Sequence, residues 1–138
     1  MRFMMFMIPN IPQDDDWMPS AEAVASMSKY NDELAQAGVL LALDGLHPES
    51  EGARVSFSGG TATVTDGPFS EAKEVIGGYW LIQAKSKEEA VEWAKRIPTV
   101  GGDFSVEVRR VFEMSDFPAD VQDAGQLSKT PPEQTASA

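Results

Sequence analysis

Segments typical of buried strands alternate with two segments typical of amphipathic helices, and this order constrains the fold of the chain most strongly. The first strand is predicted over residues 2–8, an apolar run ended by Pro9 and Pro12. Ser20 is placed to cap the first helix and Gly38 to end it. Apolar side chains recur along that helix every three or four positions, at Val24, Met27, Tyr30, Leu34 and Ala37.

The second half of the chain adds a hairpin, a helix and two strands. A strand is predicted over residues 39–43, and residues 53–65 alternate in polarity around Gly59-Gly60, which indicates a tight hairpin. Another strand is predicted over residues 79–84. The last strand is predicted over residues 106–112, where Val106, Val108, Arg110 and Phe112 alternate with Glu107, Arg109 and Val111.

The second helix has the clearest boundaries in the sequence. Ser86 and Glu89 are spaced as a capping box, in which each side chain accepts a hydrogen bond from the other residue's backbone amide. Pro98 is expected to end this helix. A turn is predicted at residues 66–69, and one or two helical turns between Ser70 and Ile76.

Without the hairpin, the order of elements is βαββαβ, which is the ferredoxin-like arrangement of an α+β protein. Both helices of this arrangement pack on one face of the sheet and leave the other face bare. A second copy of the chain packed on the bare face would bury its apolar side chains, so we expect a homodimer. The folded domain is expected over residues 1–115, with a polar tail over residues 116–138 that is partly disordered or docked.

Composition narrows the classes of function. The 138 residues include 22 acidic and 11 basic side chains, a net charge of −11, so contact with nucleic acid or an anionic membrane is not expected. The chain has no cysteine, which excludes disulfides, thiolate metal sites and thiol nucleophiles. No apolar run approaches the length of about 18 residues that a membrane helix needs, and the N-terminal run lacks the features of a signal peptide. We therefore expect a cytoplasmic protein.

His47 is the single histidine, and it lies in the loop Gly45-Leu46-His47-Pro48. It is a candidate general acid or base, because imidazole exchanges protons near neutral pH. The simpler interpretation is a surface histidine held by Pro48. Asp66 opens the turn before Pro68, where it is either a rigid carboxylate at the mouth of a cleft or a turn residue.

Other polar residues have both a structural and a functional interpretation. Glu71 and Glu74 are three residues apart, so they either act as a carboxylate pair or favour the start of a helix. Arg54 and Lys73 either hold an anionic ligand or pair with nearby acids. Tyr79 and Trp80 point to opposite faces of a strand. The acidic residues show no spacing typical of metal ligands, and no phosphate-binding loop or catalytic triad occurs, so no cofactor and no metal are expected.

The motifs GLHP, ARVSFSGG, DGPFSEAKE and GGYWLIQ occur in this order between residues 45 and 83. On these motifs the chain resembles the YCII-related proteins, and specifically the branch named for its DGPF tetrapeptide, over residues 1 to about 115. The resemblance implies a ferredoxin-like fold that dimerises into an α+β barrel. The residues that match the branch are His47, Asp66, Glu71, Lys73 and Glu74. In other members a histidine on the first helix forms a dyad with aspartate. This chain has no histidine there, so the dyad is not carried over.

Two functions are consistent with these residues. The first is a protein that binds a small molecule near the GLHP and DGPF loops, with acid–base chemistry of the lyase or dehydrohalogenase kind. His47 would carry the proton, with Asp66 as its partner; Arg54 or Lys73 would bind an anionic group, and Trp80 or Tyr30 would form an apolar wall. The second is a non-catalytic dimeric module that docks a sigma factor or another regulator, because similar domains accompany extracytoplasmic-function sigma factors.

Overall fold

A computed structural model describes residues 1–10, 16–68 and 75–125 of the chain. It is an α+β fold built on a four-stranded sheet with the strand order β2-β5-β1-β6. All neighbouring strands of this sheet are antiparallel. This is the strand order of a ferredoxin-like βαββαβ unit, so the predicted fold class is confirmed. The four strands are β1 (Arg2–Pro9), β2 (Leu40–Gly45), β5 (Gly78–Gln83) and β6 (Phe104–Arg110).

The first helix, α1 (Ala21–Gln36), begins and ends where the sequence predicts. The Ser20 hydroxyl accepts a hydrogen bond of 3.1 Å from the backbone N–H of Ala23. Gly38 follows the helix with a φ of +71°, a left-handed conformation that glycine adopts at low cost. The buried side of the helix is narrower than predicted. Tyr30 and Leu34 are buried, whereas 53% of the Val24 surface is exposed.

The second helix, α2 (Lys87–Ala94), is capped differently from a reciprocal capping box. The Ser86 hydroxyl accepts from the backbone N–H of Glu89 at 3.1 Å, as predicted. The Glu89 carboxylate, however, accepts from the backbone N–H of Lys85 at 2.8 Å, one residue before the cap. The regular helix ends at Ala94, and the chain continues to Pro98 as a turn.

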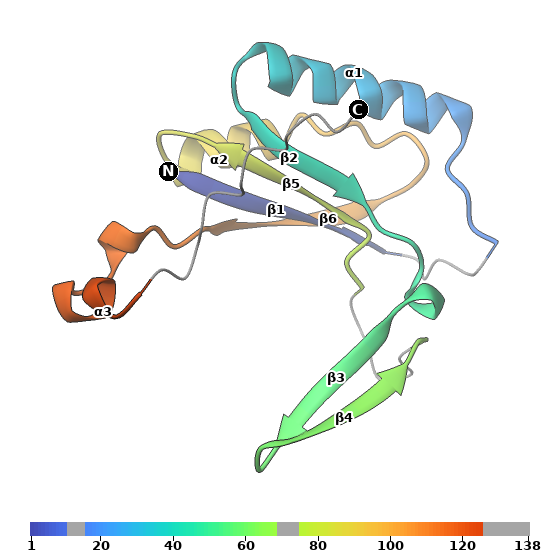
Figure 1. Ribbon diagram of the computed structural model, residues 1–138. Coiled ribbons are helices and arrows are strands. Elements are labelled where there is room, and N and C mark those ends of the chain that lie inside the picture. The colour runs from blue at the N-terminus through green and yellow to red at the C-terminus, as the bar shows by residue number, and fades with distance from the viewer. Residues whose placement is uncertain (11–15, 69–74, 126–138) are drawn as a thin grey trace, which may run out of the picture.

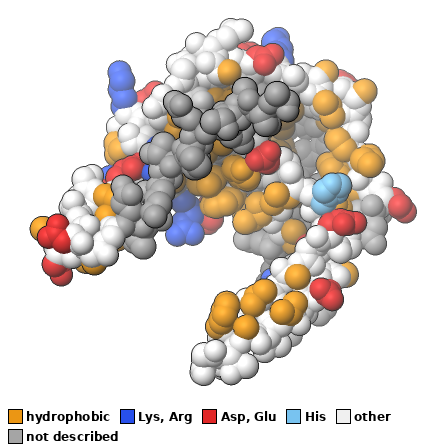
Figure 2. Space-filling view, viewed as in Figure 1, with side chains coloured by type: hydrophobic (Ala, Val, Ile, Leu, Met, Phe, Trp, Pro, Cys, Tyr) orange, Lys and Arg blue, Asp and Glu red, His pale blue; other side chains and the backbone are white. Residues whose placement is uncertain are grey.

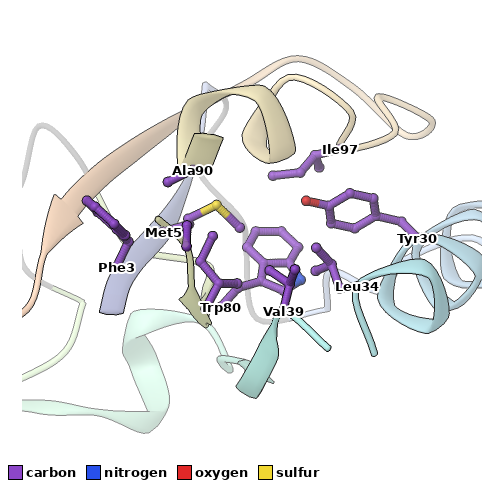
Figure 3. Close-up of a cluster of buried hydrophobic side chains, with 10 residues drawn as sticks. Phe3, Met5, Tyr30, Leu34, Val39, Trp80, Ala90 and Ile97 are labelled. Atoms are coloured by element: carbon purple, nitrogen blue, oxygen red, sulfur yellow. The ribbon is translucent and has the colours of Figure 1, made fainter. Parts of the chain in front are cut away.

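Helices α1 and α2 pack on the same face of the sheet, and the core lies between these helices and the sheet (Figure 1, Figure 3). Alternation along β1 directs Phe3 and Met5 to this face, and alternation along β5 directs Trp80 and Ile82 there. The helices and the connections contribute the rest of the core. The buried apolar residues are Phe3, Met5, Tyr30, Leu34, Val39, Trp80, Ile82, Ala84, Ala90 and Ile97.

The opposite face of the sheet carries a second apolar row. Because Phe3 and Met5 face the helices, Met4 and Phe6 on β1 face away from them. The register of β1 with β5 pairs Met4 with Leu81 and Phe6 with Tyr79. Neither α1 nor α2 covers these side chains, which are half-buried.

The predicted hairpin forms a separate two-stranded sheet of β3 (Ala53–Ser58) and β4 (Thr61–Asp66). Gly59 and Gly60 form its turn with φ values of +56° and +81°, which side-chain-bearing residues adopt at a cost. The short helix η1 (Glu49–Glu51) precedes the hairpin. Figure 1 shows the hairpin projecting from one end of the main sheet, on the side away from α1.

The last strand, β6, lies two residues earlier in the chain than the predicted range 106–112, and a C-terminal arm follows it. β6 ends at Arg110, so Phe112 lies beyond the sheet with 67% of its surface exposed, where its ring stacks on Phe117 at 5.0 Å. The arm contains the short helices η2 (Met114–Asp116) and α3 (Ala119–Ala124). Two contacts of 2.8 and 3.1 Å between the Arg2 guanidinium and the Glu113 carboxylate anchor it to β1.

Candidate functional site

A pocket of about 110 Å³ lies at the end of the main sheet where β2 finishes and β5 begins. Met27 from α1 and Met7 from β1 contribute apolar walls. Leu43 and Trp80, which are paired across β2 and β5, contribute two more. The pocket is therefore an opening between the first helix and the helix-covered face of the sheet.

Glycines form the part of the pocket at the end of β2 and the start of β5. Gly45, Gly77 and Gly78 all belong to its lining. A side chain at Gly78 would bring its Cβ within 3.0 Å of the Asp44 carbonyl oxygen, which is closer than carbon and oxygen normally approach. The Leu46 amide donates a hydrogen bond of 2.9 Å to the Gly77 carbonyl, so the GLHP loop starts directly on the pocket wall.

Two polar pairs lie at the pocket. On the helix side, the Trp80 indole Nε1–H donates a 2.9 Å hydrogen bond to Oδ1 of Asn31. On the strand edge, the Tyr79 hydroxyl donates a 2.6 Å hydrogen bond to Oδ2 of Asp44. The bond to the Asp44 carboxylate raises the pKa of the Tyr79 phenol above its usual value. Because Tyr79 alternates with Gly78 and Trp80, its side chain lies on the sheet face opposite the core, at the rim of the pocket.

The turn that begins the DGPF tetrapeptide packs against residues 49–52, which follow the GLHP loop. The Gly67 amide donates a 3.0 Å hydrogen bond to the Gly52 carbonyl. A Cβ atom at Gly67 would collide with the carbonyl oxygen of Glu49. The glycine of the DGPF tetrapeptide thus lets the turn after β4 approach the backbone that follows His47.

The two predicted catalytic residues are placed in the GLHP loop and at the start of the DGPF turn. His47 is exposed, and Asp66 is exposed at the end of β4. Among the residues that the structure describes, no hydrogen bond or ion pair joins the two side chains. Neither residue belongs to the lining of the pocket, which the loop reaches through Gly45.

The remaining predicted site residues are placed apart from one another. Trp80 lines the pocket, but Tyr30 lies in the core, where its ring meets the Trp80 ring edge-on at 6.0 Å. The Tyr30 hydroxyl donates a 2.8 Å hydrogen bond to the Trp93 carbonyl, and burial raises the pKa of this phenol to about 12. Arg54 lies on the exposed hairpin. Glu71, Lys73 and Glu74 lie outside the described residues.

The residues that the sequence analysis did not single out are Asn31 and Asp44. The sequence pattern places Asp44 in the loop after the predicted strand 39–43. In the structure it belongs to β2, and the register of β2 with β5 sets it opposite Tyr79. Within the described ranges, no group of three or more histidine, aspartate or glutamate side chains is placed to hold a metal ion. No helix in those ranges is long and apolar enough to cross a membrane.

The fold and the pocket define a ferredoxin-like α+β protein with an inserted hairpin and a small, mostly apolar pocket beside that insertion. Residues 1–115 match the YCII-related domain, and the chain belongs to this family. The chain is also 28% identical over 110 residues to an uncharacterised protein of Rhizobium meliloti (strain 1021), an alignment that covers 78% of this chain and 86% of the relative.

Proposed function

We propose that this protein binds a small, neutral molecule in the pocket between α1 and the ends of β2 and β5. The observation that carries the proposal is an apolar pocket whose wall includes Gly45, the first residue of the GLHP loop. Apolar pockets with a few polar groups are the usual form of a ligand site.

The size and charge of the pocket restrict the ligand. An apolar cavity of about 150 Å³ accommodates benzene, so a pocket of about 110 Å³ accommodates a group of about four or five carbon atoms. None of the residues in its described lining is basic, and Asp44 stands at the rim. With a net charge of −11 on the chain, an anionic ligand is disfavoured relative to a neutral one.

The Trp80 indole N–H reports on this pocket, because it lies at the wall and is bonded to Asn31. We expect 2-butanone to shift its nuclear magnetic resonance signal in a saturable way, with a millimolar dissociation constant, as suits about five non-hydrogen atoms. Butyrate, which has the same number of carbons and a negative charge, is expected to leave the signal unchanged. Absence of any shift with 2-butanone would overturn the proposal.

A matched pair of glycine variants locates the binding. The register pairs Gly45 with Gly78, on the helix-covered side of the strands, and a Cβ at Gly45 meets no atom within 4 Å. Gly45→Ala therefore adds a methyl group at the pocket and should weaken 2-butanone binding. Gly52→Ala, at which a Cβ makes only an ordinary contact of 3.4 Å with Glu49, should leave binding unchanged.

Acid–base chemistry on the bound molecule, of the lyase or dehydrohalogenase kind, is the catalytic form of this proposal. It assigns the proton transfer to His47, whose loop leaves the pocket wall at Gly45, and the partner carboxylate to Asp66 at the end of β4. Binding of 2-butanone should then shift the imidazole signals of His47 as well. A ligand that moves the Trp80 signal and leaves His47 untouched would retain the binding function and remove this chemistry.

The same proposal includes a homodimer formed through the sheet face opposite the helices. Met4, Phe6 and Leu81 form an apolar centre there, and Glu107 and Arg109 flank it on β6. We expect sedimentation equilibrium to give twice the chain mass at micromolar concentration, and Phe6→Glu to give a folded monomer. A monomeric wild type would overturn this part. Docking of a sigma factor or regulator remains the alternative function, and the acidic chain suits a basic partner.

A further inference from the structure

The hairpin of β3 and β4 has one apolar and one polar face. Its register pairs Val55 with Val64 and Phe57 with Ala62, so these four side chains share one face. The opposite face carries the polar residues Arg54, Ser56, Ser58, Thr61, Thr63 and Thr65. A hairpin exposed to water on both sides has no need for such a division.

The apolar face of the hairpin is exposed. The exposed fractions of Val55, Val64 and Phe57 are 50%, 64% and 76%, and every residue of both strands is exposed. An isolated two-stranded hairpin is marginally stable in water, and it gains stability when an apolar face is covered. Within the described residues, no helix or strand packs extensively on it.

The position of the hairpin indicates what covers this face. It projects on the side of the main sheet away from α1 (Figure 1). Figure 2 shows hydrophobic side chains along the hairpin and others over the centre of the molecule on the same visible face. A molecule seated on the open face of the sheet is therefore beside the hairpin as well.

The length of the hairpin exceeds the spacing of two packed sheets. Six residues per strand at about 3.3 Å per residue give a reach of about 20 Å, whereas face-to-face sheets lie about 10 Å apart. In a dimer packed through the open faces, a hairpin that projects on that side is therefore long enough to reach past the partner's sheet.

Charge favours a second copy of this chain over a basic protein. Residues 53–66 contain one basic residue, Arg54, and one acidic residue, Asp66, in a chain of net charge −11. The hairpin is thus a neutral part of an acidic molecule, and it can contact another copy without like-charge repulsion. A basic partner would instead be matched by acidic side chains, which the hairpin lacks apart from Asp66 at its base.

We infer that the hairpin is an arm that clasps the second subunit, with Val55, Phe57 and Val64 packed on the partner's flank. This inference rests on the proposed homodimer and adds to it a second contact, outside the sheet. The partner's flank supplies the apolar cover that the hairpin lacks among the described residues of its own chain.

The test compares substitutions on the two faces of the hairpin by sedimentation equilibrium. The double variant Phe57→Ser, Val64→Thr removes apolar contact area from both arms of the dimer, and we expect its dissociation constant to rise by about 100-fold or more. The matched control Ser56→Thr, Thr63→Ser changes the polar face by one methyl group at each position, and we expect its dissociation constant to equal that of the wild type. An unperturbed Trp80 indole signal in both variants verifies that the core, which lies outside the hairpin, is folded.

The outcomes separate this inference from the dimer itself. A monomeric wild type overturns both. If the wild type is a dimer and the apolar-face variant has the same dissociation constant, the sheet-face dimer is retained and the clasp is overturned. The apolar face of the hairpin would then bind a different protein. A benzophenone amino acid in place of Phe57 gives a second readout. Photo-crosslinks between isotopically labelled and unlabelled copies support the clasp, and crosslinks confined to one chain contradict it.

Discussion

The hydroxyl of Tyr79 lies 2.6 Å from Oδ2 of Asp44, across the β2–β5 pair at the rim of the pocket. The hydrogen bond favours the neutral phenol, so the pKa of Tyr79 is raised. The other tyrosine of the chain, Tyr30, has a pKa raised to about 12 by burial. Neither tyrosine therefore has the ordinary phenol pKa of about 10.

An ultraviolet titration of the phenols tests this relationship. Each tyrosine of the wild type should be less than half ionised at about pH 10, where an unperturbed tyrosine is half ionised. Asp44→Ala removes the acceptor and should bring one of the two ionisations to lower pH. Asp32→Ala removes an exposed acid on α1 instead of the acceptor on β2, and it should leave both phenol ionisations unchanged. A wild type in which one tyrosine ionises near pH 10 contradicts the assignment.

Tyr30 gives a second prediction, on stability at alkaline pH. Its pKa is higher in the folded protein, at about 12, than in the unfolded chain, so its contribution to stability is complete below about pH 10 and is lost as the pH rises through 12. Tyr30→Phe should lower the free energy of unfolding at neutral pH by about 1 kcal/mol, through loss of the bond to the Trp93 carbonyl.

Urea unfolding at neutral pH and at about pH 11 measures both effects. The difference in stability between wild type and Tyr30→Phe should shrink or reverse at the higher pH, because the phenylalanine has no proton to lose. An equal difference at the two pH values would mean that the Tyr30 phenol is not shifted.

Gly67 gives a third prediction, on the contact between the DGPF turn and the segment after His47. Gly67→Ala places a methyl group on the carbonyl oxygen of Glu49, and the backbone must move to relieve the collision. We expect a loss of about 1–3 kcal/mol in the free energy of unfolding, as for overpacked sites. Gly52→Ala, in the same contact, should lower the free energy of unfolding by less, because its Cβ would lie 3.4 Å from the same oxygen.

Hydrogen exchange locates the damage from Gly67→Ala. The Gly67 amide, bonded to Gly52, should exchange faster in the variant, while the amide of Met5 in the central strand keeps its protection. Unchanged exchange at Gly67 together with unchanged stability would show that the two loops do not depend on this close approach.

Features with a local cause were predictable from the sequence. The cap at Ser20, the left-handed Gly38 and the Gly59-Gly60 turn each depend on a few neighbouring residues, and each lies where the pattern indicates. The extent of the last strand was not predictable, because it depends on the partner. The Val111 amide donates to the Arg2 carbonyl, where β1 begins, and the pairing of the two strands does not continue to Phe112.

The candidate site was only partly predictable for the same reason. Alternation in β5 indicated that Tyr79 and Trp80 face opposite sides of the strand, without showing which of them faces the core; Trp80 lies both in the core and at the pocket. The Asp44–Tyr79 pair depends on an irregularity between Leu40 and Ala42, which shifts the register by one residue and sets Asp44 opposite Tyr79 rather than Gly78. Residues 40–43 are all apolar, so the extra residue of this bulge leaves no mark in the pattern of apolar and polar residues.

Glu113 gives the last prediction, on the attachment of the C-terminal arm in acid. Hydrogen bonds from the Arg2 guanidinium hold the pKa of the Glu113 carboxyl below its usual value of about 4.5. A lowered folded-state pKa contributes stability that is present above the unfolded-state pKa and is lost as the pH falls through the folded one. Acidification from about pH 5 to pH 3 should therefore release the arm from β1.

The exchange of the Asp116 and Phe117 amides, which are bonded within the arm, follows this release. Their protection should fall on acidification in the wild type. In Glu113→Gln it should be reduced already at neutral pH and change less in acid, because the charge that titrates is absent. Glu92→Gln, which breaks an exposed pair with Lys95 on α2, is the control and should leave the arm as in the wild type. Arm protection that is the same in wild type and Glu113→Gln at neutral pH would mean that the stacked rings of Phe112 and Phe117, and not the ion pair, hold the arm.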